Sequence, residues 1–343
     1  MSLRVQPFDG PEAEWDAVAG AHPGFTHFHR LGWREIMTGV FGHQCLYLGA
    51  RDETGALQAV LPLVRVKSIL FGHFLVSMPF LNYGGPLGSD EGIRLLVAAA
   101  EEEARGSGAR LLELRSRVEL PLALPVSHRK ITVVLDLPGN TDALMASFPS
   151  KLRSQVRRPG KEGVTVRFGP DQVEPFFRVF SRHMRDLGTP TLPEGWFQAI
   201  ARRFPEDSWF ACAWLNDRPV SAGAGFRWGG ELEMTWASSL SEHNRIAPNM
   251  LLYWAFMERA ISQGLSRFNF GRCTPDSGTH RFKRQWGGRD EPLWWYQRAA
   301  SGAQAAATPS PVQGAYSWGP RIWKHLPLPV ATALGPRIVR SIP

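Results

Sequence analysis

The residues best suited to chemistry in this chain lie in one short stretch, residues 264–288. A predicted strand over 265–270 is followed by a polar loop and a short basic and aromatic segment. Ligands of open α/β sheets bind beyond the carboxyl ends of strands. The stretch is therefore predicted to form the edge of an active site, with the polar side chains Arg272, Asp276, Ser277, His280 and Lys283.

Other kinds of catalytic or metal site find little support in the sequence. Cys45, Cys212 and Cys273 are far apart and form no CxxC pair, which argues against a structural zinc site or a disulfide framework. Cys45 and Cys212 lie in apolar runs and are expected in the core, and Cys273 has no base beside it in sequence. We expect no metal site, and no Ser-His-Asp or Cys-His arrangement is apparent.

The composition indicates a globular protein with roughly two domains. The chain has 343 residues, of which 43% are hydrophobic and 20% charged. Its net charge of +8 suits phosphate-bearing partners such as nucleic acid, nucleotide cofactors, anionic lipid or lipid-linked sugars. The alternative is that the arginine-rich composition raises the isoelectric point without any functional role. The N-terminus has no apolar signal region, and no run of about 18 apolar residues occurs, so we expect a cytoplasmic protein.

Hydrophobic patterns predict a mixed α/β fold in which the same order of elements occurs twice: a strand, two helices, three strands, a helix and further strands. The first half has helices over 11–19, 30–40 and 91–105, and strands over 3–8, 44–50, 56–66, 70–79, 111–115 and 131–137. The second half has helices over 170–187, 194–204 and 248–263, and strands over 164–168, 209–215, 219–228, 231–237, 265–270 and 293–298. The helix over 248–263 has so little polar face that it must be buried against a sheet.

A basic segment, residues 147–161, lies between the two halves. Pro149 can open a helix, and Pro159 is expected to end it near Arg158. The helix has an apolar side with Leu152 and Val156, and a cationic side with Lys151, Arg153, Arg157 and Arg158. The segment is either a phosphate clamp or a solvated helix face.

The C-terminal part of the chain is predicted to be less regular. Residues 300–315 are a low-complexity linker, and residues 316–343 form a tail rich in tryptophan, apolar and basic side chains. Such a tail could touch a membrane surface or dock on its own domain. The predicted division is an N-terminal domain over 1–140, the basic helix over 141–163, a second domain over 164–299, the linker and the tail.

The order of elements resembles the GNAT acyltransferase fold, used twice. In that fold, the loop before the main helix binds the pyrophosphate of the cofactor on backbone N–H groups and the helix N-terminus. The corresponding loop here is 242–249, and the resemblance implies that Arg245 and Asn249 would contact the cofactor. This loop has no glycine, and Pro248 removes an N–H group, so both features disfavour coenzyme A.

Three segments also resemble FemAB-type proteins, which are tandem GNAT-like domains. The segment over 270–287, which ends in Phe282-Lys-Arg-Gln-Trp-Gly, is similar to their C-terminal signature, and residues 151–164 are similar to their basic helix between domains. The tail over 323–340 is similar to the branch associated with exosortase/PEP-CTERM and exopolysaccharide loci.

The FemAB resemblance implies an activity and roles for individual residues. The best-known members move an amino acid from aminoacyl-tRNA to an amine of a peptidoglycan precursor. Lys283 would stabilise the oxyanion of that transfer, Asp276 would accept the proton of the amine or orient the amine, and His280 is another candidate base or a structural residue. The residues expected to contact the substrate are Lys151, Arg153, Arg157, Arg158, Tyr83 in the turn 82–86, Arg272, Ser277, His280 and Trp286.

The sequence therefore predicts an acyltransferase that moves an aminoacyl or other acyl group to an amine on a cell-envelope saccharide or its precursor. No tightly bound cofactor is expected, and the donor would be aminoacyl-tRNA or acyl-CoA. The expected partners are a phosphate-bearing saccharide or lipid-linked precursor, tRNA and, through the tail, the inner face of the membrane. Two alternatives are an acyl-CoA-dependent GNAT N-acyltransferase and a non-catalytic scaffold for polysaccharide export.

Overall fold

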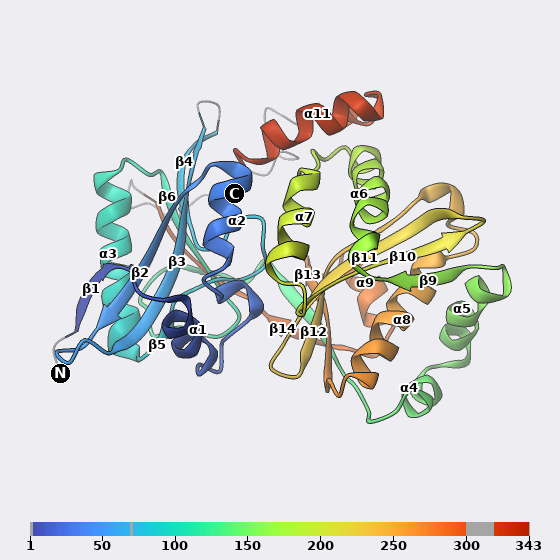
Figure 1. Ribbon diagram of the computed structural model, residues 1–343, viewed down its shortest axis with the longest axis horizontal. Helices are drawn as coiled ribbons and strands as arrows, with labels where there is room; N and C mark the ends of the chain where they lie inside the picture. Colours follow the sequence, from blue (N-terminus) through green and yellow to red (C-terminus); the bar gives the residue numbers. More distant parts are fainter. Residues whose placement is uncertain (1–2, 69–70, 300–318, 343) are drawn as a thin grey trace. The chain divides into compact units, whose positions relative to one another are not determined.

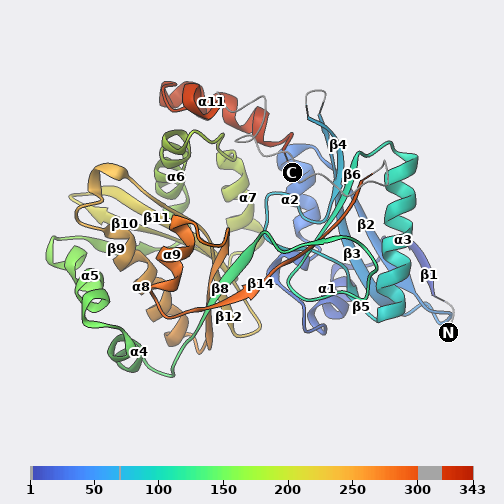
Figure 2. The same ribbon diagram turned by 180° about the vertical axis from the view of Figure 1, so that it is seen from behind.

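The computed structural model describes residues 3–68, 71–299 and 319–342, and these fall into two units. Each unit is built on one mixed sheet with helices against its faces (Figures 1 and 2). Within the described residues, unit 1 comprises 3–130, 292–299 and 338–342, and unit 2 comprises 131–291 and 319–337. The predicted mixed α/β class is confirmed. The predicted linker over 300–315 and tail residues 316–318 lie outside the described residues.

The sheet of unit 1 has the strand order β1-β2-β3-β4-β6-β15-β7, and β5 pairs with β3. β4 and β6 are parallel, and the other described pairs are antiparallel. The strands are β1 (Arg4–Pro7), β2 (Gln44–Arg51), β3 (Leu57–Ser68), β4 (Gly72–Val76), β5 (Leu87–Gly88), β6 (Leu111–Ser116), β7 (Val126–Ser127) and β15 (Trp294–Ala299).

Helices α1 (Glu12–Gly20), α2 (Trp33–Phe41) and α3 (Asp90–Gly106) cover the faces of this sheet. Successive strand residues point to opposite faces, so Ala59 and Leu61 of β3 share a core with α3. Helices α1 and α2 contact β3 and β2 and lie on the other face (Figure 1). The Ser89 hydroxyl caps α3 by accepting a hydrogen bond from the Gly92 N–H at 3.2 Å, so the predicted helix over 91–105 has a clear start and is confirmed.

The sheet of unit 2 has the strand order β14-β8-β13-β12-β11-β10-β9. β12 and β13 are parallel, as β4 and β6 are in unit 1. The strands are β8 (Ile131–Asp136), β9 (Thr165–Phe168), β10 (Ser208–Leu215), β11 (Arg218–Trp228), β12 (Glu231–Ser239), β13 (Arg267–Cys273) and β14 (Arg289–Pro292).

Helices α5 and α8 lie on one face of this sheet, and α6 and α7 lie on the other (Figure 1). Met250, Leu252 and Phe256 of α8 are almost fully buried in the core, which confirms the prediction that this helix packs on a sheet. The helices are α4 (Thr141–Ser147), α5 (Ser150–Lys161), α6 (Val173–Leu187), α7 (Glu194–Arg203), α8 (Pro248–Ser262), α9 (Gly278–Arg284), α10 (Gly319–Trp323) and α11 (Leu328–Val339).

The predicted repeat of element order is present in both units. In each, a strand and two helices precede a three-stranded meander, and a helix then leads to a strand that is parallel to the last strand of the meander. The crossover helix is α3 in unit 1 and α8 in unit 2. The tight turns of the second meander follow the sequence signals, because Asn216 and Asp217 have φ of 47° and 56°, and Gly229 and Gly230 have φ of 47° and 80°.

Two strands belong to different units from those assigned by sequence. The strand predicted over 131–137 in the first half is β8, which pairs with β13 in unit 2. The strand predicted over 293–298 in the second half is β15, which pairs with β6 in unit 1. The pattern of a strand records how deeply it is buried but does not record which sheet edge it joins, because that edge is supplied by distant residues. Helices α4 and α5, predicted as a separate basic segment, are part of unit 2.

Residues 319–337 of the tail pack on unit 2. A Cβ atom at Gly335 of α11 would lie 2.8 Å from the backbone N of Thr191, closer than ordinary contacts allow, so glycine permits this close approach. Ala331 is buried, and Arg185 of α6 donates a hydrogen bond to the Leu326 carbonyl at 3.1 Å. These contacts are those expected of a docked tail. None of the helices in the described residues is long and apolar enough to cross a membrane.

Candidate active site

Lys283 lies on α9, the short helix that follows the end of β13. It is 4% exposed, and Nζ donates hydrogen bonds to the backbone carbonyls of Gly271 at 2.6 Å and Arg272 at 3.0 Å. Burial lowers the pKa of Lys283 from 10.5 to about 8, while Cys273 and Glu233 oppose this effect and Arg272 adds to it. The ammonium is therefore mostly protonated at neutral pH but close to its titration point.

The two carbonyls that hold Lys283 come from an irregular part of β13. The pairing of β13 with β8 shifts register between Asn269 and Arg272, and Gly271 has φ of 72° there. Glycine adopts this left-handed conformation without the steric cost that a side chain would bring. Successive carbonyls of a regular strand point in opposite directions, so the bulge is what allows both to face one ammonium group.

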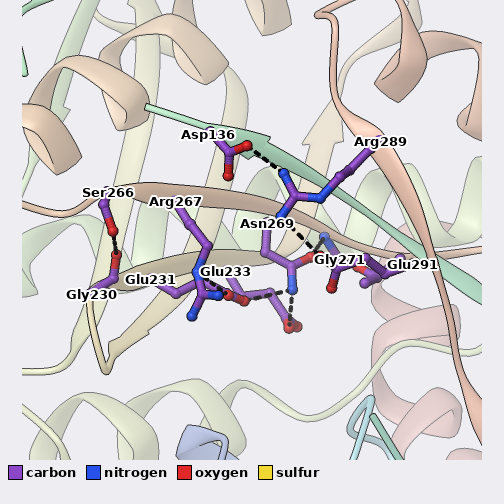
Figure 3. A network of polar contacts seen from close by, with 11 residues as sticks. Asp136, Gly230, Glu231, Glu233, Ser266, Arg267, Asn269, Gly271, Arg289 and Glu291 are labelled. Atoms are coloured by element: carbon purple, nitrogen blue, oxygen red, sulfur yellow. Dashed lines mark hydrogen bonds and ion pairs between the residues drawn. The ribbon is translucent and has the colours of Figure 1, made fainter. Parts of the chain in front are cut away.

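Asn269 is the centre of a buried polar network that supports this bulge (Figure 3). Its Oδ1 accepts hydrogen bonds from the Gly271 N–H at 2.8 Å and from the Thr132 hydroxyl. Its Nδ2 donates to Oε1 of Glu231 at 2.8 Å and to Oε2 of Glu233 at 3.4 Å. Both carboxylates are fully buried, which is costly unless they are paired and hydrogen-bonded. Asn269 therefore links two buried acidic groups to the backbone that holds Lys283.

The network lies where two parallel strands separate. β12 pairs with β13 only over 231–233 and 267–269. Beyond that point β12 stays paired with β11 as far as Ser239, while β13 pairs with β8 at Arg272 and Cys273. The carboxyl ends of the two strands and the first turn of α8 lie at this end of the sheet, which is where ligands of open α/β sheets bind.

The loop between β13 and α9 is held together by Ser277 and His280. The Ser277 hydroxyl caps α9, accepting from the His280 N–H at 3.1 Å and donating to the Thr274 carbonyl at 2.7 Å. Nδ1 of His280 accepts from the Asp276 N–H at 3.0 Å, and Nε2 lies 3.0 Å from a carboxylate oxygen of Asp290. Because both ring nitrogens already have partners, these contacts favour the structural interpretation of His280 over the role of a base.

Asp276 is placed differently from its neighbours. It is exposed, and its backbone has φ of 61°. Its backbone N–H and carbonyl bind His280 and Arg281, while the described residues offer its carboxylate no hydrogen-bond or ion-pair partner. The carboxylate is thus accessible to a substrate, and its role as proton acceptor stays a prediction.

Arg272 is half-buried, and its backbone carbonyl accepts a hydrogen bond from Nζ of Lys283.

Two residues expected to contact the substrate are in the core instead. Trp286 is 1% exposed, and its ring packs near those of Phe270 and Phe282 in unit 2. Tyr83 is fully buried in unit 1, with its ring 5.9 Å from that of Phe28. Large aromatic side chains contribute most to stability when buried, so the core takes residues whose type also suits a binding site.

The loop before α8 offers few groups to an anion. Arg245 is exposed and Asn249 is half-buried. Ala247 directly precedes the helix with φ of 58°, and Pro248 occupies its first position without an N–H group. The structure thus keeps Arg245 near the helix N-terminus, as predicted, but one of the N–H groups that a pyrophosphate would use is missing.

Helix α5 has the two sides that the sequence predicted. Leu152 and Val156 are buried in the core that includes α8, while Lys151, Arg157 and Arg158 are exposed. Arg153 differs from them, because it is half-buried and donates a hydrogen bond to the Phe148 carbonyl at 2.6 Å. The cationic side available to a ligand is therefore formed by three of the four predicted residues.

The prediction that Pro159 ends α5 near Arg158 is wrong, because the helix continues to Lys161. Pro159 lies in the last turn, so only one backbone hydrogen bond near the helix end is lost. Pro159 is buried, and its carbonyl accepts hydrogen bonds from the N–H groups of Glu162 at 3.0 Å and Val164 at 2.9 Å. Burial of Pro159 and these bonds compensate for the missing donor.

The polar network was not predicted from the sequence. Glu231 and Glu233 alternate with Leu232 and Met234, which is also the pattern of a half-exposed strand. Asn269 lies between Phe268 and Phe270 in an apolar strand, and a polar side chain at such a position indicates a buried hydrogen-bonding partner. This signal could have identified Asn269 from the sequence. Among the residues that the structure describes, no group of His, Cys, Asp and Glu side chains is placed to hold a metal ion.

Comparisons with known proteins agree with this fold. Residues 146–284 match the family described as "Acetyltransferase (GNAT) domain". The chain is also similar to UDP-N-acetylmuramoylpentapeptide-lysine N(6)-alanyltransferase of Weissella viridescens, with 25% identity over 135 residues. That match covers 37% of this chain and spans 40% of the relative's length.

Two solved structures resemble the whole fold. The structure of FemX superposes with a TM-score of 0.64 and 17% identity, and the match covers 86% of this chain and 97% of FemX. A tandem GNAT protein from the clavulanic acid biosynthesis pathway superposes with a TM-score of 0.51 and 13% identity, covering 88% of this chain and 100% of that protein. This chain therefore has the tandem GNAT fold, and its residues 146–284 match the acetyltransferase (GNAT) domain family.

Proposed function

We propose that this protein transfers an aminoacyl or other acyl group from an activated donor to an amine on a cell-envelope precursor. The observation that carries the proposal is the buried Lys283, with a pKa of about 8, on the helix α9 that follows β13 in a GNAT-type domain. The similarity to an alanyltransferase whose name specifies a UDP-N-acetylmuramoylpentapeptide acceptor supports the aminoacyl group and the peptidoglycan-type acceptor.

In the proposed reaction, the neutral amine of the acceptor attacks the ester carbonyl of aminoacyl-tRNA. An amide C–N bond forms, the ester C–O bond breaks, and the proton of the amine passes to the leaving ribose oxygen, directly or through Asp276. The ammonium of Lys283 stabilises the oxyanion of the tetrahedral intermediate, where a fixed charge in a dry site acts strongly. The same steps with a C–S bond describe an acyl-CoA donor.

The acceptor is proposed to carry phosphate groups that bind Lys151, Arg157 and Arg158. These three exposed cations lie on one helix, and the relative's name specifies a nucleotide-linked acceptor. The resemblance of the tail to the exosortase/PEP-CTERM branch favours an exopolysaccharide or lipid-linked saccharide as the specific acceptor of this chain. The N–H group missing at Pro248 and the absence of glycine from the loop before α8 favour aminoacyl-tRNA as the donor over acyl-CoA.

The test is transfer of labelled acyl groups from charged tRNA and from acyl-CoA to candidate envelope precursors. Transfer from one donor alone identifies that donor. Failure of both donors, with folded protein and with UDP-linked and lipid-linked acceptors supplied, would contradict the proposal.

The pH dependence of this transfer is expected to be bell-shaped. On the acidic side of the curve, the rate should increase with pH because more of the acceptor amine is deprotonated. Above about pH 8, kcat should fall because Lys283 loses the positive charge that stabilises the oxyanion. The measurement is kcat at saturating substrates in steps across this range. In Lys283→Met the falling part of the curve should be absent, and an unchanged curve would assign it to another group.

The cationic side of α5 should affect binding of the acceptor more than the chemical step. We expect the variant Lys151→Gln/Arg157→Gln/Arg158→Gln to raise KM for the acceptor about tenfold at low salt, with kcat nearly unchanged, because three exposed charge contacts are lost. The matched control is Arg178→Gln/Arg202→Gln/Arg218→Gln, which removes three exposed charges elsewhere on the same unit. Equal effects of the two variants would indicate a general effect of charge.

A further inference from the structure

A separate cavity of about 220 Å³ lies at the other end of the unit 2 sheet from Lys283. It is enclosed by the start of β10, the end of β11, and the ends of α7 and α8. The lining residues Ser208 and Arg227 belong to the start of β10 and the end of β11, where Ser208 pairs with Phe226. Trp228 at the end of β11 pairs with Glu231, the first residue of β12. The cavity therefore lies near the beginning of β12 and β13, and not at the point where these two strands separate. The reaction proposed above does not use this end of the sheet.

The cavity presents one cation and one anion that have no ion-pair partner among the described residues. Arg259 of α8 is exposed, and its guanidinium lies 4.9 Å from the ring centre of Phe168 and 4.9 Å from that of Trp209. Two aromatic faces hold this group in position and leave its N–H donors available. Glu206 is also exposed at the rim.

The second arginine of the lining is already occupied. Arg227 donates a hydrogen bond to the Glu206 backbone carbonyl at 3.0 Å and lies 3.4 Å from a carboxylate oxygen of Asp207. Its charge is therefore compensated by the protein itself. The charges left for a ligand are one guanidinium and one carboxylate.

The aromatic part of the cavity lining lies on the α8 face of the sheet. Trp209 of β10 and Phe168 both line the cavity beside Arg259, while the ring of Phe210, the next residue of β10, packs against Phe176 and Phe197 on the opposite face. An engineered apolar cavity of about 150 Å³ is already large enough to bind benzene. The recess can therefore accept the side chain of a ligand whose charged end remains at the rim.

We infer that this cavity binds a zwitterionic α-amino acid with an apolar side chain. Its carboxylate would accept hydrogen bonds from Arg259, its ammonium would pair with Glu206, and its side chain would contact Trp209 and Phe168. A purely anionic or purely cationic ligand would leave one of the two rim charges without a partner. The inference stands on its own residues and does not depend on the reaction at Lys283.

Calorimetric titration of the full chain with L-phenylalanine, 3-phenylpropanoate and 2-phenylethylamine tests the inference, because the last two each lack one charge. We expect L-phenylalanine to bind, and each analogue to bind about tenfold more weakly through loss of one charge-assisted contact. Arg259→Gln and Glu206→Gln should each weaken L-phenylalanine binding to a similar extent. Glu206→Gln should not weaken 3-phenylpropanoate binding, since that analogue has no ammonium and its carboxylate is repelled by Glu206.

Two further variants separate the cavity from general effects. Ala201→Leu places a larger side chain in the lining and should abolish binding of all three compounds. Arg202→Gln removes an exposed charge from the same helix outside the lining and should change nothing. L-Phenylalanine should also bind to Lys283→Met with unchanged affinity. The outcome of this binding experiment is therefore independent of the acyl-transfer proposal.

The inference would be overturned by equal affinity for the three compounds, by unchanged binding to Ala201→Leu, or by absence of L-phenylalanine binding to the unmodified chain at millimolar concentration. If a variant fails to fold, the comparison of the three compounds on the unmodified chain decides the question alone.

Discussion

Lys283→Met should lower kcat for acyl transfer by about 10²- to 10³-fold, the effect of removing one group that stabilises an oxyanion. Methionine has a similar length and keeps the buried volume filled, so the variant removes the positive charge and the two hydrogen bonds to the Gly271 and Arg272 carbonyls. The KM values should change little, because Lys283 acts on charge that develops only in the transition state. The measurement is single-turnover transfer from charged tRNA, with melting temperature measured in parallel.

The control for this variant is Lys67→Met, which removes an exposed lysine of unit 1 and should keep full activity. A kcat within about threefold of the unmodified protein would exclude Lys283 as the stabilising group, since that corresponds to less than 1 kcal/mol. In cells, full rescue of a deletion strain by Lys283→Ala would favour the scaffold alternative over catalysis.

Asn269→Leu should have the largest effect on stability, about 3–5 kcal/mol for unit 2, which is typical when a partner of buried charges is removed. The leucine would leave the Gly271 N–H and the buried carboxylates of Glu231 and Glu233 without the amide that now contacts them. The measurement is hydrogen exchange of the β13 amides, which reports the opening free energy of unit 2 separately from that of unit 1.

Asn244→Leu is the matched control, because Asn244 is exposed on the loop before α8 and should tolerate the change. Asn269→Leu should also lower kcat, since the bulge that directs two carbonyls at Lys283 loses its support. Loss of less than about 1 kcal/mol at Asn269 would show that the surrounding backbone holds the bulge without the amide.

Much of the fold was predictable because its signals are local. The helix over 248–263 is apolar on nearly all sides, and the hairpin turns carry Asn-Asp and Gly-Gly pairs, so their positions follow from adjacent residues. The exchange of β8 and β15 between the predicted halves was not predictable in this way. Each strand completes a sheet formed mostly by residues far from it in sequence.

The candidate site was likewise predictable only in part from the sequence. The types of residue at Lys283, Lys151, Arg157 and Arg158, and the two sides of the basic helix, were determined by the sequence itself. The state of these groups was decided by the tertiary structure. The pKa of Lys283 is lowered because the rest of unit 2 removes water from it, and two carbonyls face it because Asn269 supports a bulge.

Burial likewise decided between roles that the sequence left open. Trp286 and Tyr83 have side chains that suit either a binding site or a core, and their neighbours place both in the core. His280 accepts a hydrogen bond from the Asp276 N–H and lies beside the Asp290 carboxylate, and these contacts favour the structural interpretation. Residue type and local periodicity therefore determined which groups this protein can use, while desolvation and partners from distant strands, which no local pattern encodes, determined how each is used.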